Sequence, residues 1–164
     1  MTTSTRRPFR IRQAGLSDLP EAAAVVSRAW RQTYPGLIPA QVIERHEKGV
    51  AERAQRWQRA ASEGQYYWIV LEDDRIVGVA SAVPARDDDA PAALELAMCY
   101  LLDVAKGSGI ADHLLHVAIG DSPAYLWVAE GNERAAAFFR RHGFSPTGRS
   151  RDNGGYRCVM LSRD

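Results

Sequence analysis

The stretch LELAMCYLLDVAKGSGIA, residues 94–111, decides how this chain folds. Residues 94–102 are apolar and predict a strand, and the segment after Gly109 has the spacing of an amphipathic helix. A helix N-terminus leaves backbone N–H groups unpaired and carries partial positive charge, so a strand, a glycine turn and a helix in this order predict an anion site. Gly107 and Gly109 let the backbone approach a phosphate closely, and Lys106 adds a formal charge. The alternative is an ordinary turn whose glycines cap the helix.

The spacing of this loop differs from two common phosphate-binding motifs. Asp112 stands where a Gly-x-Gly-x-x-Gly motif needs its third small residue, and no Gly-Lys-Ser/Thr closes the loop. The loop resembles the acyl-CoA pyrophosphate loop of the GCN5-related N-acetyltransferase (GNAT) family, which reads Arg or Gln, two residues, Gly, one residue, and Gly or Ala. Lys106, Gly109 and Ala111 fill those places. Lysine keeps the charge of arginine and loses its planar fork.

Composition places the chain among globular proteins of one domain. Its 164 residues are 46% hydrophobic and 25% charged, and the net charge of +1 gives no overall field that favours nucleic acid or a membrane. We expect one domain over residues 1–164, with residues 1–8 as a mobile tail that is no secretory signal. Cys99 and Cys158 are too few for a disulfide framework, so a cytoplasmic protein is expected.

Hydrophobic periodicity and turn residues divide the chain into strands and helices. Asp18 with Glu21 predicts a helix N-cap pair, Asn132 predicts another N-cap, and Asn153-Gly154 predicts a hairpin turn. The predicted strands are residues 9–14, 66–71, 75–83, 94–102, 125–129, 144–149 and 156–161. The predicted helices are one that starts at Asp18, a region over 39–61 with a break at Gly49, and the segments 110–119 and 132–142.

This order of elements is that of the GNAT fold, and the resemblance covers almost the whole chain. It implies an α/β fold with a mixed, mostly antiparallel sheet of six to seven strands. It also implies about four flanking helices and a splay between the fourth and fifth strands. The further matching blocks are residues 95–102, 126–128 with 130–132, 136–139 with 142–144, and several residues of 30–39.

The resemblance implies an acyl-CoA-dependent N-acetyltransferase. Such an enzyme transfers acetyl from acetyl-CoA to a primary amine of a small molecule or peptide by direct attack in a ternary complex. The pantetheine arm would lie between the splayed strands and bond to backbone N–H groups near Leu101 and Asp103, in the manner of an oxyanion hole. The cofactor-binding residues are then Leu101, Leu102, Asp103, Lys106, Gly107, Ser108, Gly109, Ile110, Ala111, Asn132 and Phe139.

Proton transfer is where the chain departs from the family's pattern. Glu95 is the candidate base, since burial in an apolar strand favours a raised carboxyl pKa, although it could instead face solvent. The family's usual tyrosine general acid is replaced by Phe139, which has no proton to donate. The thiolate leaves unaided, or Tyr34, Tyr100 or Tyr156 substitutes. The alternative function is a non-catalytic acyl-CoA-binding or sensing module.

The acceptor side is less defined by sequence. Trp30, Tyr34 and Tyr156 are candidate substrate contacts, with core packing as the alternative. The acidic residues 87–89 either attract an amine or form a solvated loop. An arginine-rich stretch at residues 6–12 leaves a nucleic-acid role as a third hypothesis, although we expect no nucleic-acid or membrane partner. No metal site is expected, and a homodimer stays open.

Overall fold

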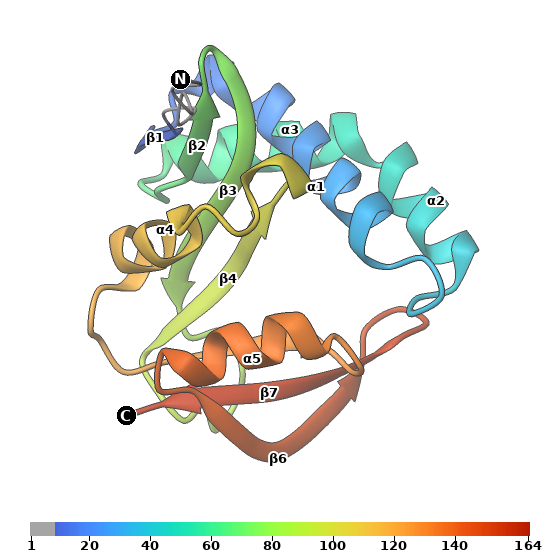
Figure 1. The fold of residues 1–164 in the computed structure, drawn as a ribbon, viewed down its shortest axis with the longest axis vertical. Helices are drawn as coiled ribbons and strands as arrows, with labels where there is room; N and C mark the ends of the chain where they lie inside the picture. Colours follow the sequence, from blue (N-terminus) through green and yellow to red (C-terminus); the bar gives the residue numbers. More distant parts are fainter. Residues whose placement is uncertain (1–8) are drawn as a thin grey trace, which may run out of the picture.

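The computed structural model describes residues 9–164, which form one seven-stranded sheet with the strand order β1-β2-β3-β4-β5-β7-β6 (Figure 1). Every neighbouring pair is antiparallel except β4 and β5, so the predicted mixed sheet is confirmed. The strands are β1 Phe9–Gln13, β2 Trp68–Glu72, β3 Arg75–Pro84, β4 Leu94–Leu101, β5 Ala124–Ala129, β6 Ser145–Asp152 and β7 Arg157–Arg163. The helices are α1 Leu19–Thr33, α2 Ala40–Lys48, α3 Val50–Ser62, α4 Ile110–Ile119 and α5 Glu133–Arg141, with short 3-10 turns at Leu16–Asp18 and Asp103–Ala105.

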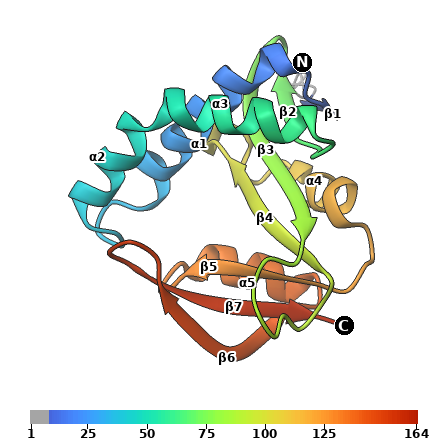
Figure 2. The same cartoon turned by 180° about the vertical axis from the view of Figure 1, so that it is seen from behind.

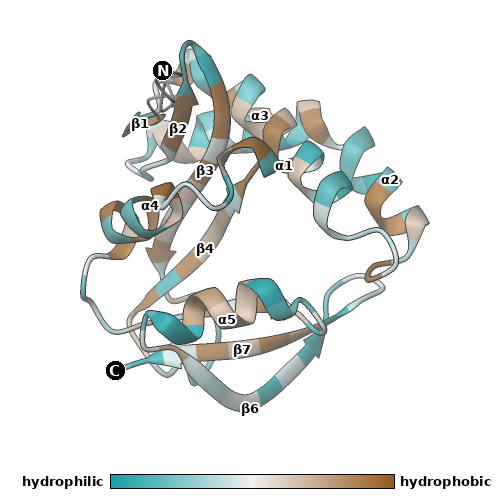
Figure 3. Ribbon diagram, viewed as in Figure 1, coloured by the Kyte–Doolittle hydropathy of each residue, from teal (hydrophilic) through white to brown (hydrophobic). Residues whose placement is uncertain are grey.

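Helices cover both faces of the sheet. Helices α1, α2 and α3 lie on one face, and α4 and α5 lie on the other (Figures 1 and 2). Apolar residues concentrate in the central strands, while the helices carry polar residues outward (Figure 3). The buried residues form two clusters: the larger includes Leu19, Ile69 and Val79, and the smaller includes Leu126 and Phe144 around β5 and α5. The smaller core spans the junction between β4 and β5, because it also contains Leu96 of β4 and Leu115 of α4.

The junction between β4 and β5 is splayed. The two strands share one register pair, Glu95 with Tyr125, although β4 has eight residues. On the other edge of β4, Ser81 pairs with Met98 and the next residue pairs with Leu96, so Ala97 is an extra, bulged residue. A bulge bends its strand and increases the local twist, which turns the second half of β4 away from β5. The predicted splay is confirmed, and the bulge is its local cause.

One local prediction, the N-cap pair of Asp18 and Glu21, needs correction. Asp18 does not cap α1 with its side chain: its carboxylate accepts from the Gly15 N–H (2.8 Å) and from the Arg12 guanidinium (2.7 Å), which closes the preceding 3-10 turn. Glu21 reaches across to the Ile76 N–H (3.1 Å) and ties α1 to β3. The predicted break at Gly49 is confirmed, since it separates α2 from α3 and gives five helices in residues 9–164.

Contacts outside the sheet also join the two halves of the molecule, which are β1–β4 with α1–α3 and β5–β7 with α5. The turn between β6 and β7 meets α2, where the Arg45 guanidinium donates to the Gly154 carbonyl (2.8 Å). The Tyr156 ring packs edge-on against Trp30, with centroids 5.8 Å apart. The predicted mobile tail, residues 1–8, lies outside the described residues. Over residues 9–164, no helix is both long and apolar enough to cross a membrane.

Candidate functional site

A cavity of about 490 Å³ opens at the splay. The second half of β4, the middle of β5, α5, the loop before α4 and the end of α1 all contribute to its wall. Because β4 and β5 diverge here, their facing edges lack the strand pairing that continues elsewhere in the sheet. An extended ligand placed between these edges would find backbone donors and acceptors.

The loop of residues 106–111 forms one end of this cavity, through Lys106, Gly107, Gly109 and Ala111. Both glycines have left-handed backbone angles, with φ of 78° at Gly107 and 85° at Gly109. A Cβ built on either glycine would meet no atom within 4 Å, so the space in front of the backbone is open. Side-chain capping is limited to Ser108, whose hydroxyl accepts from the Ile110 N–H (3.3 Å). The geometry fits an anion at the N-terminus of α4 better than a turn that only caps the helix.

Ser108 and Ile110 have a structural place in this loop and do not line the cavity. The Ser108 hydroxyl donates to the Ala105 carbonyl (2.6 Å), which holds the loop against the preceding turn. Lys106 lines the cavity, and its ammonium contacts Asp103 Oδ1 (2.9 Å) and Thr33 Oγ1 (3.3 Å). Its charge is therefore held at the mouth of the loop by a mostly exposed carboxylate.

Near Leu101 and Asp103, where backbone donors for pantetheine are expected, two N–H groups are already used. The Asp103 N–H donates to Gln32 Oε1 (2.8 Å), and the Leu102 N–H donates to the Val77 carbonyl (2.8 Å). Neither residue lines the cavity, whereas Leu101 does. Sequence could place these three residues at the end of the strand, but it could not show that the Gln32 side chain from α1 would reach Asp103.

Helix α5 supplies the opposite wall. Asn132 accepts from the Ala135 N–H (3.3 Å), so it is the predicted N-cap, and it also lines the cavity. Phe139 lines the cavity too and packs against Phe144 with ring centroids 5.7 Å apart.

Four further residues of α5 that line the same cavity were missed: Arg134, Ala135, Phe138 and Arg141. Arg134, Phe138 and Arg141 recur at i, i+4 and i+7, and this spacing places them on one face of the helix. That spacing was visible in the sequence. Asp112 of α4 also lines the cavity, and its carboxylate bonds to His142 Nε2 (2.7 Å), which joins α4 to the end of α5.

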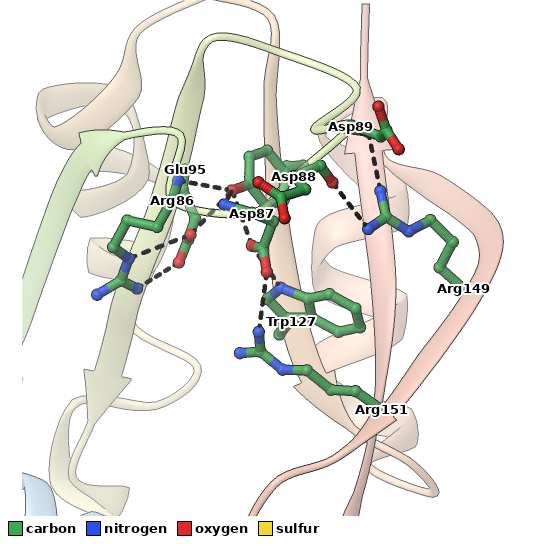
Figure 4. Close-up of polar contacts among 9 residues, drawn as sticks. Arg86, Asp87, Asp88, Asp89, Glu95, Trp127, Arg149 and Arg151 are labelled. Atoms are coloured by element: carbon green, nitrogen blue, oxygen red, sulfur yellow. Dashed lines mark hydrogen bonds and ion pairs between the residues drawn. The ribbon is translucent and has the colours of Figure 1, made fainter.

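Glu95, the candidate base, lies at the closed end of the splay and does not line the cavity. It is buried, and the Arg86 guanidinium binds both of its carboxylate oxygens (Figure 4). The Tyr125 hydroxyl contacts Glu95 Oε1 at 3.0 Å. The predicted burial is present, but this paired carboxylate is occupied by neighbours, which disfavours a direct role in catalysis.

Asp87 extends the same network to the other half of the molecule (Figure 4). Its carboxylate accepts from the Tyr125 hydroxyl (2.9 Å), Trp127 Nε1 (3.0 Å) and Arg151 Nη1 (3.1 Å). Burial alone would raise the pKa of Asp87, but these hydrogen bonds and the positive charge of Arg151 outweigh it and lower that pKa. Asp87 is thus part of a structural junction, and the reading of residues 87–89 as a freely solvated loop fails for it.

The same loop is also held through its backbone. The Arg149 guanidinium of β6 donates to the carbonyls of Asp89 (2.9 Å) and Asp88 (3.3 Å), as Figure 4 shows. The loop between β3 and β4 therefore bridges the two halves of the sheet at the end where the strands still meet.

The predicted aromatic contacts divide into two groups. Tyr34 lines the cavity, as does Tyr100 of β4, and burial raises the pKa of each phenol. Trp30 and Tyr156 do not line it. Trp30 is only 8% exposed and stacks on His46 with ring centroids 3.8 Å apart, so its geometry is that of core packing.

The remaining candidates from the sequence are Cys99, a metal site and the N-terminal basic stretch. Cys99 lines the cavity, but burial raises its pKa to about 12. Within residues 9–164, no group of three or more His, Cys, Asp or Glu side chains could hold a metal ion. Two arginines of the N-terminal basic stretch are engaged locally: Arg12 pairs with Asp18, and Arg10 donates to the Asp73 carbonyl (3.0 Å).

Known proteins resemble this chain in sequence and in fold. A probable N-acetyltransferase of Mycobacterium tuberculosis is 25% identical over 146 residues, which cover 87% of this chain and 83% of that protein. An uncharacterized N-acetyltransferase of Bacillus subtilis is 28% identical over 130 residues, which cover 74% and 72% of the two chains. The crystal structure of PaiA N-acetyltransferase from Thermoplasma acidophilum in complex with coenzyme A shares the fold, with a TM-score of 0.70 at 18% identity over 96% of this chain and 99% of that one. A model of the acetyltransferase (GNAT) family matches residues 25–144, so the chain belongs to the GNAT family and is an N-acetyltransferase.

Proposed function

We propose that this enzyme transfers an acetyl group from acetyl-CoA to a primary amine of a small molecule or peptide by direct attack in a ternary complex. The observation that carries the proposal is a single cavity that runs from the glycine loop of residues 106–111 to the hydroxyl-bearing side chains of Tyr34 and Tyr100. A thioester bound between β4 and β5 would be open to an acceptor that enters from the tyrosine side. The coenzyme A bound to the Thermoplasma relative supports the choice of cofactor.

The cavity offers complementary groups for each part of the cofactor. Backbone N–H groups at the start of α4, with Lys106, suit the pyrophosphate. Arg134 and Arg141 on α5 supply positive charge for the remaining phosphate. The pantetheine arm would then add to the open strand edges beside Leu101 and Asn132.

A thermal-unfolding experiment tests cofactor binding directly. A ligand at about 100 times its Kd stabilises a protein by about 2.7 kcal/mol, which is a shift of several degrees for a domain of this size. We expect acetyl-CoA and CoA to shift the Tm clearly and ATP to shift it little. Equal shifts with ATP, or no shift with acetyl-CoA, would contradict the proposed site.

Direct attack is preferred to an acyl-enzyme because the one thiol in the cavity wall is poorly reactive. With its pKa raised to about 12, Cys99 carries almost no thiolate at neutral pH, and the thiolate is the nucleophile. We expect the intact mass of the protein to stay unchanged after incubation with acetyl-CoA. A stable mass increase of one acetyl group, absent in Cys99→Ala, would overturn direct attack.

The departing thiolate needs a proton donor other than Phe139. Tyr34 and Tyr100 are the phenols in the cavity wall, and their raised pKa keeps both protonated at neutral pH. We propose that one of them donates this proton. Tyr34→Phe or Tyr100→Phe should then lower kcat by about tenfold or more, and Phe139→Tyr should restore part of the loss. Unchanged kcat in both variants would mean that the thiolate leaves unaided.

The non-catalytic alternative is not favoured by any contact in the site. Its support was Phe139, and the presence of two other phenols in the cavity removes the argument that no proton donor exists.

A further inference from the structure

The charges around the cavity constrain which amines the enzyme can accept. Among the described residues of its wall, Lys106, Arg134 and Arg141 are cationic and Asp112 is the one carboxylate. Asp112 is bound to His142 Nε2 (2.7 Å). The three cations are those proposed for the cofactor phosphates, so the one carboxylate in this wall that an ammonium acceptor could meet is Asp112, which already binds His142.

Asp112 is also the one carboxylate among the described residues of this wall that could remove a proton from an ammonium ion, and it lies with His142 beside Arg141, at the end proposed for the phosphates. Glu95 lies outside this wall, held by Arg86 and Tyr125. The tyrosines carry their protons at neutral pH, and the Cys99 thiol does too, because burial raises these pKa values. A lysine-like amine, with a pKa of about 10.4, is neutral in only roughly one molecule in two thousand at pH 7. An amine of low basicity has no such requirement.

An aromatic wall is held in a fixed orientation beside this basic surface. Trp127 of β5 lines the cavity, and its Nε1 donates to Asp87 Oδ2 (3.0 Å). The Arg151 guanidinium lies over the indole, 4.1 Å from the ring centroid, and itself bonds to Asp87 (Figure 4). With a cation already over the indole, the ring is better used for contact with a neutral planar group than with a second cation.

We propose, as a refinement that rests on the proposed acetyl transfer, that the acceptor is a weakly basic aromatic amine that enters as the neutral amine and lies against Trp127. Its nitrogen lone pair attacks the thioester carbonyl carbon, the C–S bond breaks, and the proton released from nitrogen ends on the CoA sulfur. The products are an N-acetyl arylamine and CoA thiol, so the step needs no further reactant. Asp87 and Arg151 are positioning residues, because they act on the acceptor through the indole.

Two isomeric amines test the proposal. p-Toluidine and benzylamine have the same atoms and one benzene ring each, but the nitrogen of p-toluidine is on the ring and is weakly basic. With acetyl-CoA as donor, we expect kcat/KM at pH 7 to be at least about tenfold higher for p-toluidine. Its rate should stay flat between about pH 7 and about pH 9, while that of benzylamine should rise with the fraction of neutral amine.

The opposite results would overturn the acceptor class. Equal or faster acetylation of benzylamine at pH 7, or of spermidine, would show that the enzyme deprotonates or attracts ammonium acceptors. Failure with p-toluidine in a protein whose Tm rises with acetyl-CoA would also reject the acceptor class and leave the cofactor site standing. If acetyl-CoA gave no Tm shift, the result would contradict the proposed function itself, and the acceptor proposal that rests on it would be rejected too.

Trp127→Leu separates the indole's role from general damage. It should raise the KM for p-toluidine at least about fivefold and leave the KM for acetyl-CoA within about twofold, and Trp127→Phe should recover part of the loss. Trp68→Leu is the matched control, since Trp68 is also half-buried on a strand and does not line the cavity. Unchanged KM values in a folded Trp127→Leu protein would show that the indole does not contact the acceptor.

Discussion

The two ends of the β4–β5 junction differ in almost every physical respect. At the closed end, Glu95 pairs with Tyr125 in the ladder, and the buried Glu95 and Tyr125 side chains bond to each other and to the more exposed Arg86. At the open end, the same strand leaves its edge unpaired beside a cavity of about 490 Å³. The bulged residue Ala97 lies between the closed end and the open end of β4. The polar groups of β4 thus bond within the protein at the closed end, and at the open end they are available to a ligand.

This division explains why Asp87 and Glu95 are not free to act on a substrate. Asp87 and Glu95 lie at the closed end, where the ladder between β4 and β5 is only one residue pair long. The hydrogen bonds from Tyr125 and the arginines connect the halves where strand pairing does not. Catalytic chemistry is then left to the groups of the open end.

The largest expected effect is at the open end, in Gly109→Ala. The new Cβ would stand in the open space before the loop, and the residue would be strained at φ 85°. Loss of two charge-assisted hydrogen bonds, each worth about 1.5–3 kcal/mol, would lower kcat/KM for acetyl-CoA by about a hundredfold or more. Steady-state kinetics and the Tm shift with CoA measure this loss.

Gly148→Ala is the control for that experiment. Gly148 has the same φ of 85°, and a Cβ added there would likewise meet no atom within 4 Å, yet it lies in β6, away from the loop. It should share the cost in stability and keep the response to CoA. Similar losses of CoA binding in both variants would show that strain, not phosphate access, explains the effect.

A second change addresses the closed end. Tyr125→Phe removes the hydroxyl that contacts both Asp87 and Glu95 and accepts from the Arg86 N–H (3.2 Å). Leaving buried polar groups unsatisfied costs about 1–3 kcal/mol, so the Tm should fall by several degrees. Tyr66→Phe, at an exposed tyrosine, should change the Tm little. If Tyr125→Phe had the same Tm as the parent, the polar network would not contribute measurably to joining the two halves of the molecule.

The closed end should also make stability depend on pH. The pKa of Asp87 is lowered in the folded protein, so its contribution is fully present above the unfolded carboxyl pKa of about 3.9 and is lost as pH falls through the lower folded value. Urea unfolding should therefore show Asp87→Asn less stable than the parent near neutral pH, with a gap that narrows in acid. Asp88→Asn changes the neighbouring carboxyl and leaves the contacts of Asp87 in place. A gap that stays constant with pH would contradict the role given to the Asp87 charge.

The sequence was informative where local patterns decide the structure. The glycine loop, the start of α4 and the Asn132 cap follow from residues close to one another in the chain. The hydrogen bonds of Glu95 to Tyr125 and of Asp103 to Gln32 could not be predicted in this way, because these partners are distant in sequence and a local pattern carries no signal for them. The Asp18 cap failed for a different reason, since Arg12 and Gly15, which are close in sequence, compete for its carboxylate.

The smallest effect concerns the exposed rim of the open end. Arg141→Gln removes one cation from the cavity wall, and the measured worth of exposed ion pairs is about 0.2–1 kcal/mol. The KM for acetyl-CoA should rise by about two- to fivefold, and the difference from the parent should shrink at high salt because exposed charges are screened. Arg140→Gln makes the same change one residue away on α5, at a side chain that does not line this cavity, and should leave that KM unchanged. If both variants raised the KM equally, the cofactor would respond to the overall charge of α5, and the cavity would not be the reason that Arg141 matters.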